Sequence, residues 1–160
     1  MGTEIALMNP GGIRADIEAG EVTWGELFAV QPFGNDLVRM TLTGAQIIAL
    51  LNQQWEGQPF ARIMKPSGLT YTWRENGPGF ADNRVDPASI LVNGSPLDPL
   101  ASYSVTVNSF MAGGGDNFSV LIEGTERVIG PVDLDALIDY IESLPQPFSA
   151  AIEGRISTLP

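Results

Sequence analysis

Two glycine-rich stretches contain the residue types that a small-molecule site needs. Residues 9–14 read Asn-Pro-Gly-Gly-Ile-Arg, and residues 108–116 read Asn-Ser-Phe-Met-Ala-Gly-Gly-Gly-Asp. Each stretch follows an apolar run that predicts a strand, breaks into glycines and ends on a charged side chain. Because glycine has no Cβ, its backbone N–H can approach a ligand closely and its backbone accepts positive φ. We therefore predict that the two loops form a binding rim rather than two ordinary turns.

The composition excludes several kinds of catalytic centre. The 160 residues include no cysteine and no histidine, which rules out disulfides, thiolate metal sites and a Ser-His-Asp triad. Hydrolytic zinc and two-metal sites depend heavily on imidazole ligands, and no run of carboxylates has EF-hand spacing. We therefore expect no metal ion or other cofactor in this chain, and a reacting centre that lies elsewhere.

The net charge of −11, with a single lysine, argues against a nucleic-acid polymer as partner, because such binding requires clustered cations. No apolar stretch is long enough to span a bilayer, so we expect no membrane insertion by this chain. The N-terminus lacks the basic-then-apolar layout of a signal peptide. With a strand expected almost at once, the chain resembles a piece of a longer protein.

Short strands and helices alternate without a regular rhythm. The pattern predicts strands at residues 4–8, 36–42, 69–74, 90–93, 103–107 and 150–156, a turn at 76–79, and a hairpin at Asn93-Gly94. Thr23 with Glu26 forms a capping box that predicts a helix through about Phe28. We read these elements as one α+β domain spanning residues 1–160.

Two further helices are expected. Thr43 caps the first, whose apolar face is Ile47, Ile48, Leu51 and Trp55 at helical spacing. In the C-terminal helix, the apolar face is Leu134, Leu137, Ile138 and Ile141. Its acidic residues, Asp133, Asp135 and Asp139, are explained by solubility and by the helix dipole.

Several motifs occur in the order found in one known family. They lie at residues 9–14, 23–35, 67–71, 103–110, 114–118 and 153–156. In this arrangement the chain, from about Ile5 to Ile156, resembles the C-terminal domain of the 5′-nucleotidase family, which also includes UDP-sugar hydrolases and cyclic-nucleotide phosphodiesterases. The resemblance implies an N-terminal metallophosphatase domain with two divalent metal ions, absent here, and a C-terminal domain that binds the nucleoside or nucleotide.

The resemblance also assigns roles to individual residues. It implies that Phe33 and Phe110 stack on the two faces of the base. It implies that Asp116 accepts hydrogen bonds from ribose hydroxyls and that Arg14 contacts the ribose or phosphate side. Asn9 would lie near the edge of the base.

Physical chemistry supports these roles. Stacking on an aromatic ring contributes about 1–3 kcal/mol per base and tolerates any base. A carboxylate can accept from two vicinal hydroxyls, which distinguishes ribose from deoxyribose. An arginine beside glycine N–H groups such as that of Gly12 offers donors to phosphate oxygens.

Simpler interpretations stay open for the same residues. Phe33 can instead fill the core, and Met111 and Phe118 compete with Phe110 for the exposed position. An Asx-turn would account for Asp116, and a surface ion pair for Arg14. We interpret Asp82 and Asp86 as solvated loop charges. The tryptophans, Trp24, Trp55 and Trp73, are expected in the core or at an interface.

The whole protein implied by the resemblance is an extracellular, periplasmic or surface-attached hydrolase of nucleotides, in which this chain selects the substrate and by itself hydrolyses nothing. Nucleoside monophosphates, cyclic nucleotides and UDP-sugars all carry a base and a ribose, so the sequence does not separate them. Two alternatives remain: an assembly domain that forms a homodimer, and a stand-alone nucleoside-binding module.

Overall fold

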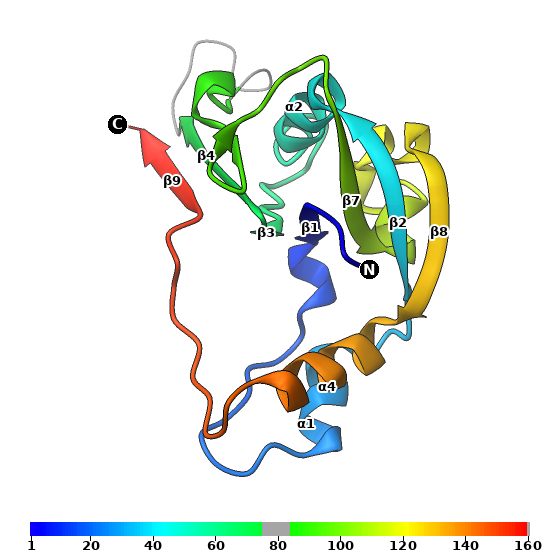
Figure 1. Cartoon of the computed structure of the whole chain (residues 1–160), viewed down its shortest axis with the longest axis vertical. Coiled ribbons are helices and arrows are strands. Elements are labelled where there is room, and N and C mark those ends of the chain that lie inside the picture. Colours follow the sequence, from blue (N-terminus) through cyan, green and yellow to red (C-terminus); the bar gives the residue numbers. More distant parts are fainter. Residues whose placement is uncertain (75–83, 160) are drawn as a thin grey trace.

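The computed structural model describes residues 1–74 and 84–159 and contains two β-sheets, with helices between and beside them (Figure 1). The turn expected at residues 76–79 and Asp82 lie outside the described residues. Strands and helices mix without a repeated strand–helix–strand order, which confirms the α+β class.

The strands are β1 Ile5–Met8, β2 Asp36–Thr43, β3 Lys65–Ser67, β4 Leu69–Arg74, β5 Leu91–Val92, β6 Ser95–Pro96, β7 Ser102–Asn108, β8 Thr125–Val132 and β9 Ile156–Leu159. The α-helices are α1 Trp24–Val30, α2 Gly44–Asn52, α3 Ser109–Ala112 and α4 Asp133–Ser143. Short 3-10 turns are η1 Pro10–Gly12, η2 Pro87–Ser89, η3 Gly115–Asn117 and η4 Ser119–Glu123.

The larger sheet has the strand order β3-β1-β7-β2-β8. Strands β1 and β7 are parallel neighbours, with Ile5 opposite Val105, whereas β2 runs antiparallel to β7, with Leu37 opposite Asn108. The carboxyl ends of β1 and β7 therefore meet at the edge of the sheet where β2 begins. Both glycine-rich loops and the turn before β2 leave the sheet at this one edge.

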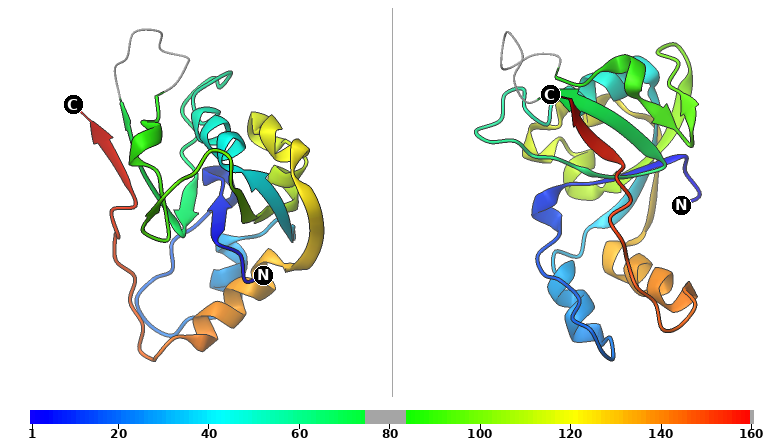
Figure 2. Two further views of the ribbon diagram at one scale, coloured as in Figure 1. Left: turned by 45° about the horizontal axis from the view of Figure 1, so that its top comes forward. Right: turned by 90° about the vertical axis from the view of Figure 1, so that its left-hand side faces the viewer.

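The smaller sheet has the order β6-β5-β4-β9. Its β5–β6 hairpin turns at Asn93 and Gly94, both with positive φ (48° and 82°), as the Asn-Gly pair predicted. The last strand was predicted at residues 150–156, and this prediction is wrong, because the strand is Ile156–Leu159. Residues 144–155 form no strand and run from α4 to β9 (Figure 2), with Phe148 packed against the small cluster of α1 and α4. At the end of this segment, the carbonyl of Arg155 accepts from the N–H of Tyr71 in β4 (3.0 Å). Pairing begins only where β9 reaches Tyr71.

One hydrophobic core joins the two sheets through α2, whose Ile47, Leu50 and Leu51 are buried. Thr23 forms the predicted capping box at the start of α1. Thr43 caps α2 as predicted, and its partner Gln46 completes a capping box there too. Trp55 lies beyond the end of α2 rather than on its helical face. It is nevertheless buried, with its ring 4.8 Å from that of Trp73.

A separate small cluster of buried residues joins α1 to α4 at the lower end of Figure 1. Leu27 packs there with Leu134 and Ile141, two residues of the predicted apolar face of α4. This pair of helices stands apart from the main core.

Asp133, at the start of α4, is only 4% exposed, so its interpretation as a solubilising charge is wrong. Its backbone N–H donates to the carbonyl of Asn35 (2.8 Å), and its carboxylate accepts from the N–H of Leu134 (2.9 Å). Burial raises the pKa of the Asp133 carboxyl above its ordinary value of 3.8, although the hydrogen bonds from Leu134 and Asn35 act in the opposite direction. Asp133 therefore fixes α4 to the start of β2.

The raised pKa of Asp133 predicts a pH-dependent cost. Because the folded state binds this proton more tightly than the unfolded state, the ionised carboxylate lowers stability at neutral pH, and the cost disappears as pH falls toward 3.8. Asp133→Asn, which keeps an acceptor for Leu134, is expected to be more stable than wild type at pH 7. The gain in free energy of unfolding over wild type, measured by urea denaturation, should shrink as the pH is lowered.

The matched control is Asp135→Asn, at an exposed position of the same helical turn, which should show no such gain. An Asp133→Asn protein that is less stable than wild type by the same amount at every pH would contradict this account.

Candidate binding site at the glycine loops

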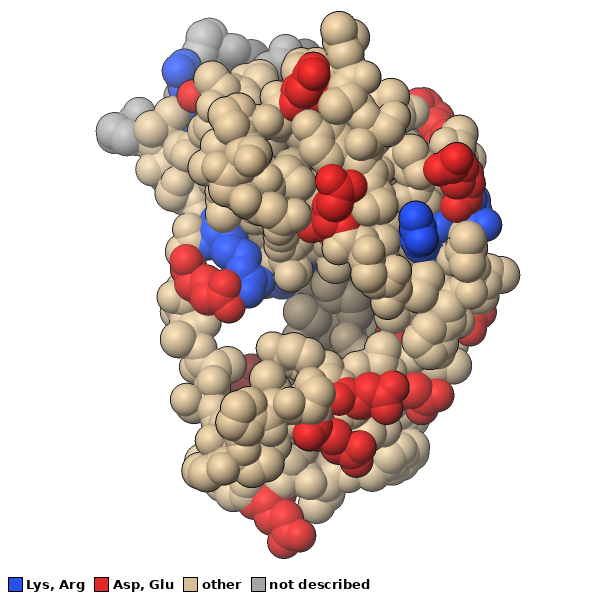
Figure 3. Space-filling view, in the orientation of Figure 1, with Lys and Arg blue, Asp and Glu red and all other residues tan. Residues whose placement is uncertain are grey.

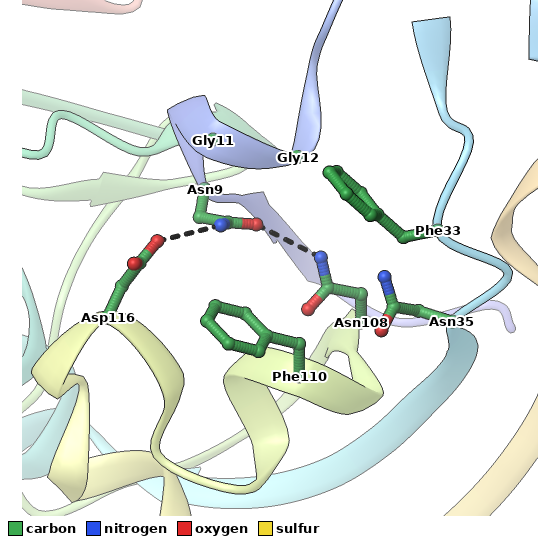
Figure 4. A pocket seen from close by; sticks show the side chains of 8 residues that line it. All are labelled: Asn9, Gly11, Gly12, Phe33, Asn35, Asn108, Phe110 and Asp116. Atoms are coloured by element: carbon green, nitrogen blue, oxygen red, sulfur yellow. Dashed lines mark hydrogen bonds between the residues drawn. The ribbon is translucent and has the colours of Figure 1, made fainter. Parts of the chain in front are cut away.

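A cavity of about 260 Å³ lies at the sheet edge where the loops meet (Figure 4). Its lining residues are Asn9, Gly11, Gly12, Phe33, Asn35, Asn108, Phe110 and Asp116. Every site residue predicted from the sequence is among them except Arg14. The lining residues come from three segments, which the parallel and antiparallel pairing of β1, β7 and β2 brings together.

The two predicted aromatic rings both reach this cavity. Phe33 is 59% exposed and Phe110 48% exposed, and their rings lie on opposite sides of an open space (Figure 4). Met111 and Phe118 are fully buried instead. Phe33 therefore does not fill the core, and Phe110 is the aromatic residue of the second loop that stays accessible.

Local structure explains why Phe110 points outward. Asn108 caps α3 by accepting the N–H of Met111 (2.8 Å), so Phe110 and Met111 occupy successive helical positions that face in different directions. A Cβ at Gly115 would come within 2.6 Å of the Phe110 ring. Glycine at this position lets the ring lie against the second loop.

The polar side of the cavity is a chain of hydrogen bonds. Asn9, only 3% exposed, donates from Nδ2 to Oδ2 of Asp116 (2.8 Å), and its Oδ1 accepts from Nδ2 of Asn108 (3.0 Å). Pro10 holds Asn9 in an extended conformation, with φ −70° and ψ 145°. Both ends of the Asn9 amide thus have partners within the protein, and its contact with a base edge stays a prediction.

Asp116 has a left-handed backbone, with φ 56° and ψ 27°. Its Oδ1 forms an ion pair with Nη1 of Arg62 at 2.8 Å, while its Oδ2 accepts from Asn9. Gln58 donates to its backbone carbonyl (2.6 Å). The carboxylate therefore serves contacts between distant loops, and the Asx-turn interpretation is wrong.

The first glycine loop is tightly packed on its inner side. A Cβ at Gly12 would meet Cε of Met8 at 2.7 Å and Oδ1 of Asn9 at 2.8 Å, so a side chain there would require Met8 and Asn9 to move. Arg14 follows with an exposed side chain outside the cavity, and its N–H donates to the carbonyl of Val30 (2.9 Å). Its contact with the sugar or phosphate also stays a prediction.

Sequence reasoning did not single out Asn35, Asn108 or Arg62. Asn35 and Asn108 both lie within motifs that were recognised, two residues from Phe33 and from Phe110, so their position was a usable signal. Arg62 belongs to a loop without periodicity or a glycine pattern, and nothing in the sequence marked it.

Charge on the surface follows the composition. Acidic side chains are spread over the face in Figure 3, whereas lysine and arginine occupy few places. Among residues 1–74 and 84–159, no group of acidic side chains is arranged to hold a metal ion. Within the same residues, every helix is too short or too polar to cross a bilayer.

The sequence profile of the family described as 5′-nucleotidase, C-terminal domain, matches residues 1–123. The chain is 36% identical over 158 residues to the endonuclease YhcR of Bacillus subtilis (strain 168), covering 98% of this chain and 12% of that protein. It is also 36% identical over 163 residues to the cell wall protein Lmo0130 of Listeria monocytogenes, covering 95% of this chain and 20% of the relative.

Among solved structures, a 5′-nucleotidase precursor from Thermus thermophilus superposes with a TM-score of 0.87 at 41% identity. The match covers 99% of this chain and 32% of that structure. The chain therefore spans about a third or less of the length of each of these proteins. By its profile, its relatives and its fold, this chain belongs to the family of 5′-nucleotidase C-terminal domains.

Proposed function

We propose that residues 1–160 form a single nucleotide-recognition domain that holds the base between Phe33 and Phe110. The observation that carries the proposal is the shared cavity, which has two exposed rings on opposite sides and a fixed carboxylate at its polar end. Its volume of about 260 Å³ is near the lower end of the range for small-molecule pockets, about 300 Å³.

The aromatic pair supplies affinity and the polar end supplies selectivity. Leaving two phenylalanines exposed at one opening has no benefit for folding, since each would gain from burial. A planar base placed between them covers both rings. The Asp116 carboxylate then accepts from the ribose hydroxyls, and Arg14, beside the loop of Gly12, contacts the phosphate.

The substrate is a nucleotide that a larger protein hydrolyses. We infer that a metallophosphatase domain of the same polypeptide holds two divalent metal ions and performs the chemistry, while this chain positions the nucleoside. The cell wall protein among the relatives supports an extracellular or surface-attached location. The matched region makes up only 12% and 20% of two relatives. This small share supports a domain of a larger protein over a stand-alone nucleoside-binding module.

An assembly role is a second candidate, favoured by one exposed feature of α1. Trp24 (61% exposed) stacks on Phe28 (43% exposed), with ring centroids 5.1 Å apart. A second copy of this chain would cover the pair. Sedimentation equilibrium tests this role: the candidate predicts a dimer that Trp24→Ser converts to monomer, and a wild-type monomer at high concentration contradicts it.

Adenosine is expected to raise the melting temperature of the chain. At a hundredfold excess over Kd, a ligand adds about 2.7 kcal/mol to folding stability, which corresponds to several degrees. At the same adenosine concentration, Phe110→Ala should reduce the shift by about a third to nine-tenths, because loss of one stacking ring removes about 1–3 kcal/mol.

Phe28→Ala is the matched control, since Phe28 is exposed but does not line the cavity, and it should keep the full shift. If Phe110→Ala also kept the full shift, Phe110 would not be part of the base site.

The isolated chain is expected to release no phosphate from AMP when manganese or zinc is added, because its described residues contain no candidate metal site. A colorimetric phosphate assay checks this directly. Metal-dependent release that the Phe110→Ala variant loses would contradict the division of labour proposed here, since it would place catalysis in this chain.

A further inference from the structure

We propose that Arg62 is a positioning residue that fixes the Asp116 carboxylate for ribose and so sets the preference for ribonucleosides over deoxyribonucleosides. The inference rests on the nucleoside-binding function proposed above and adds a residue that lies outside the cavity. Arg62 reaches the site only through Asp116.

The Arg62–Asp116 pair is sheltered from solvent. The Nη1–Oδ1 distance is 2.8 Å, and the two side chains are 21% and 18% exposed. The guanidinium also lies over the ring of Phe60, 4.8 Å from its centroid. A partly buried ion pair keeps its geometry better than an exposed pair, and the contact with Phe60 adds to it although that ring is itself exposed.

The loop that carries Arg62 is anchored to the core by Gln54, which is fully buried. The backbone carbonyl of Gln54 accepts from the N–H of Arg62 (2.8 Å), and its Oε1 accepts from the N–H of Met64 (2.8 Å). Gln58 of the same loop donates to the backbone carbonyl of Asp116. This loop therefore holds Asp116 by its side chain and by its backbone.

The ion pair leaves capacity for a ligand. Oδ1 of Asp116 accepts from Arg62 and Oδ2 accepts from Asn9, and each carboxylate oxygen has two lone pairs. One acceptor site on each oxygen is thus open to a vicinal hydroxyl. Because the rotamer is fixed before the ligand arrives, binding avoids an ordering cost equivalent to about threefold to tenfold in affinity.

A competing interpretation is that Arg62 blocks Asp116 and must leave before ribose binds. The cavity is open with the ion pair formed, and Arg62 does not line it, so the guanidinium does not occupy the ligand space. The two interpretations predict opposite effects of removing Arg62: weaker binding of ribonucleosides if it positions Asp116, and tighter binding if it blocks.

The test is calorimetric titration of the wild-type chain, Arg62→Gln and Arg62→Lys with adenosine, 2′-deoxyadenosine and 2′,3′-dideoxyadenosine. Arg62→Gln should lose about threefold to tenfold in affinity for adenosine and keep the wild-type affinity for the dideoxy compound, which relies on stacking. The adenosine affinity of Arg62→Lys, which retains the charge on a single donor nitrogen, should lie between those of the wild type and Arg62→Gln. Arg39→Gln is the matched control at an exposed position outside the cavity and should match wild type.

A double-mutant cycle with Asp116→Asn isolates the mechanism. If Arg62 acts through Asp116, Arg62→Gln adds no further loss of adenosine affinity once Asp116 is replaced. Equal loss for all three nucleosides, an unchanged adenosine-to-dideoxyadenosine ratio, or tighter adenosine binding would overturn the proposal.

If Arg62→Gln fails to fold, the adenosine-to-dideoxyadenosine affinity ratio of Arg62→Lys tests the role of Arg62 instead. A wild-type chain that binds none of the three nucleosides would overturn the proposed function together with this inference. Wild-type binding with an unchanged ratio in the variants would overturn the role of Arg62 alone.

Discussion

The parallel pairing of β1 with β7, flanked by antiparallel β2, is the constraint on which the site depends. Parallel neighbours end at the same edge, so Asn9 and Asn108 come within hydrogen-bonding distance (3.0 Å) although they lie in opposite halves of the chain. The antiparallel β2 begins at that edge and brings Phe33 with it. A shift in this pairing would separate the two rings and remove the cavity.

The cavity combines one fixed wall with two accessible rings. Asp116, Asn9 and Asn108 are linked by hydrogen bonds that already satisfy the buried amide of Asn9, so the polar wall needs no rearrangement. Phe33 and Phe110 instead leave apolar surface exposed, and only a flat ligand can cover both. In the proposed function, affinity and selectivity therefore come from different residues, as expected of a domain that recognises a nucleoside common to several substrates.

Local sequence signals predicted the capped helices, the Asn-Gly hairpin and most strands, because each depends on neighbouring residues. The motif resemblance predicted that Phe33 and Phe110 would face one site. Asp133 was misinterpreted because its burial comes from packing against the start of β2, far away in the chain. The last strand was misplaced because apolar residues form a strand only where a partner edge exists. Arg62 could not be found from the sequence, since its partner lies in another loop.

The crystal structure of this chain with adenosine is the most direct measurement of the central claim. The account predicts the adenine ring between Phe33 and Phe110, with the 2′- and 3′-hydroxyls on the Asp116 carboxylate and the Arg62 ion pair intact. A nucleoside bound elsewhere while the cavity between the two rings stays empty would contradict it.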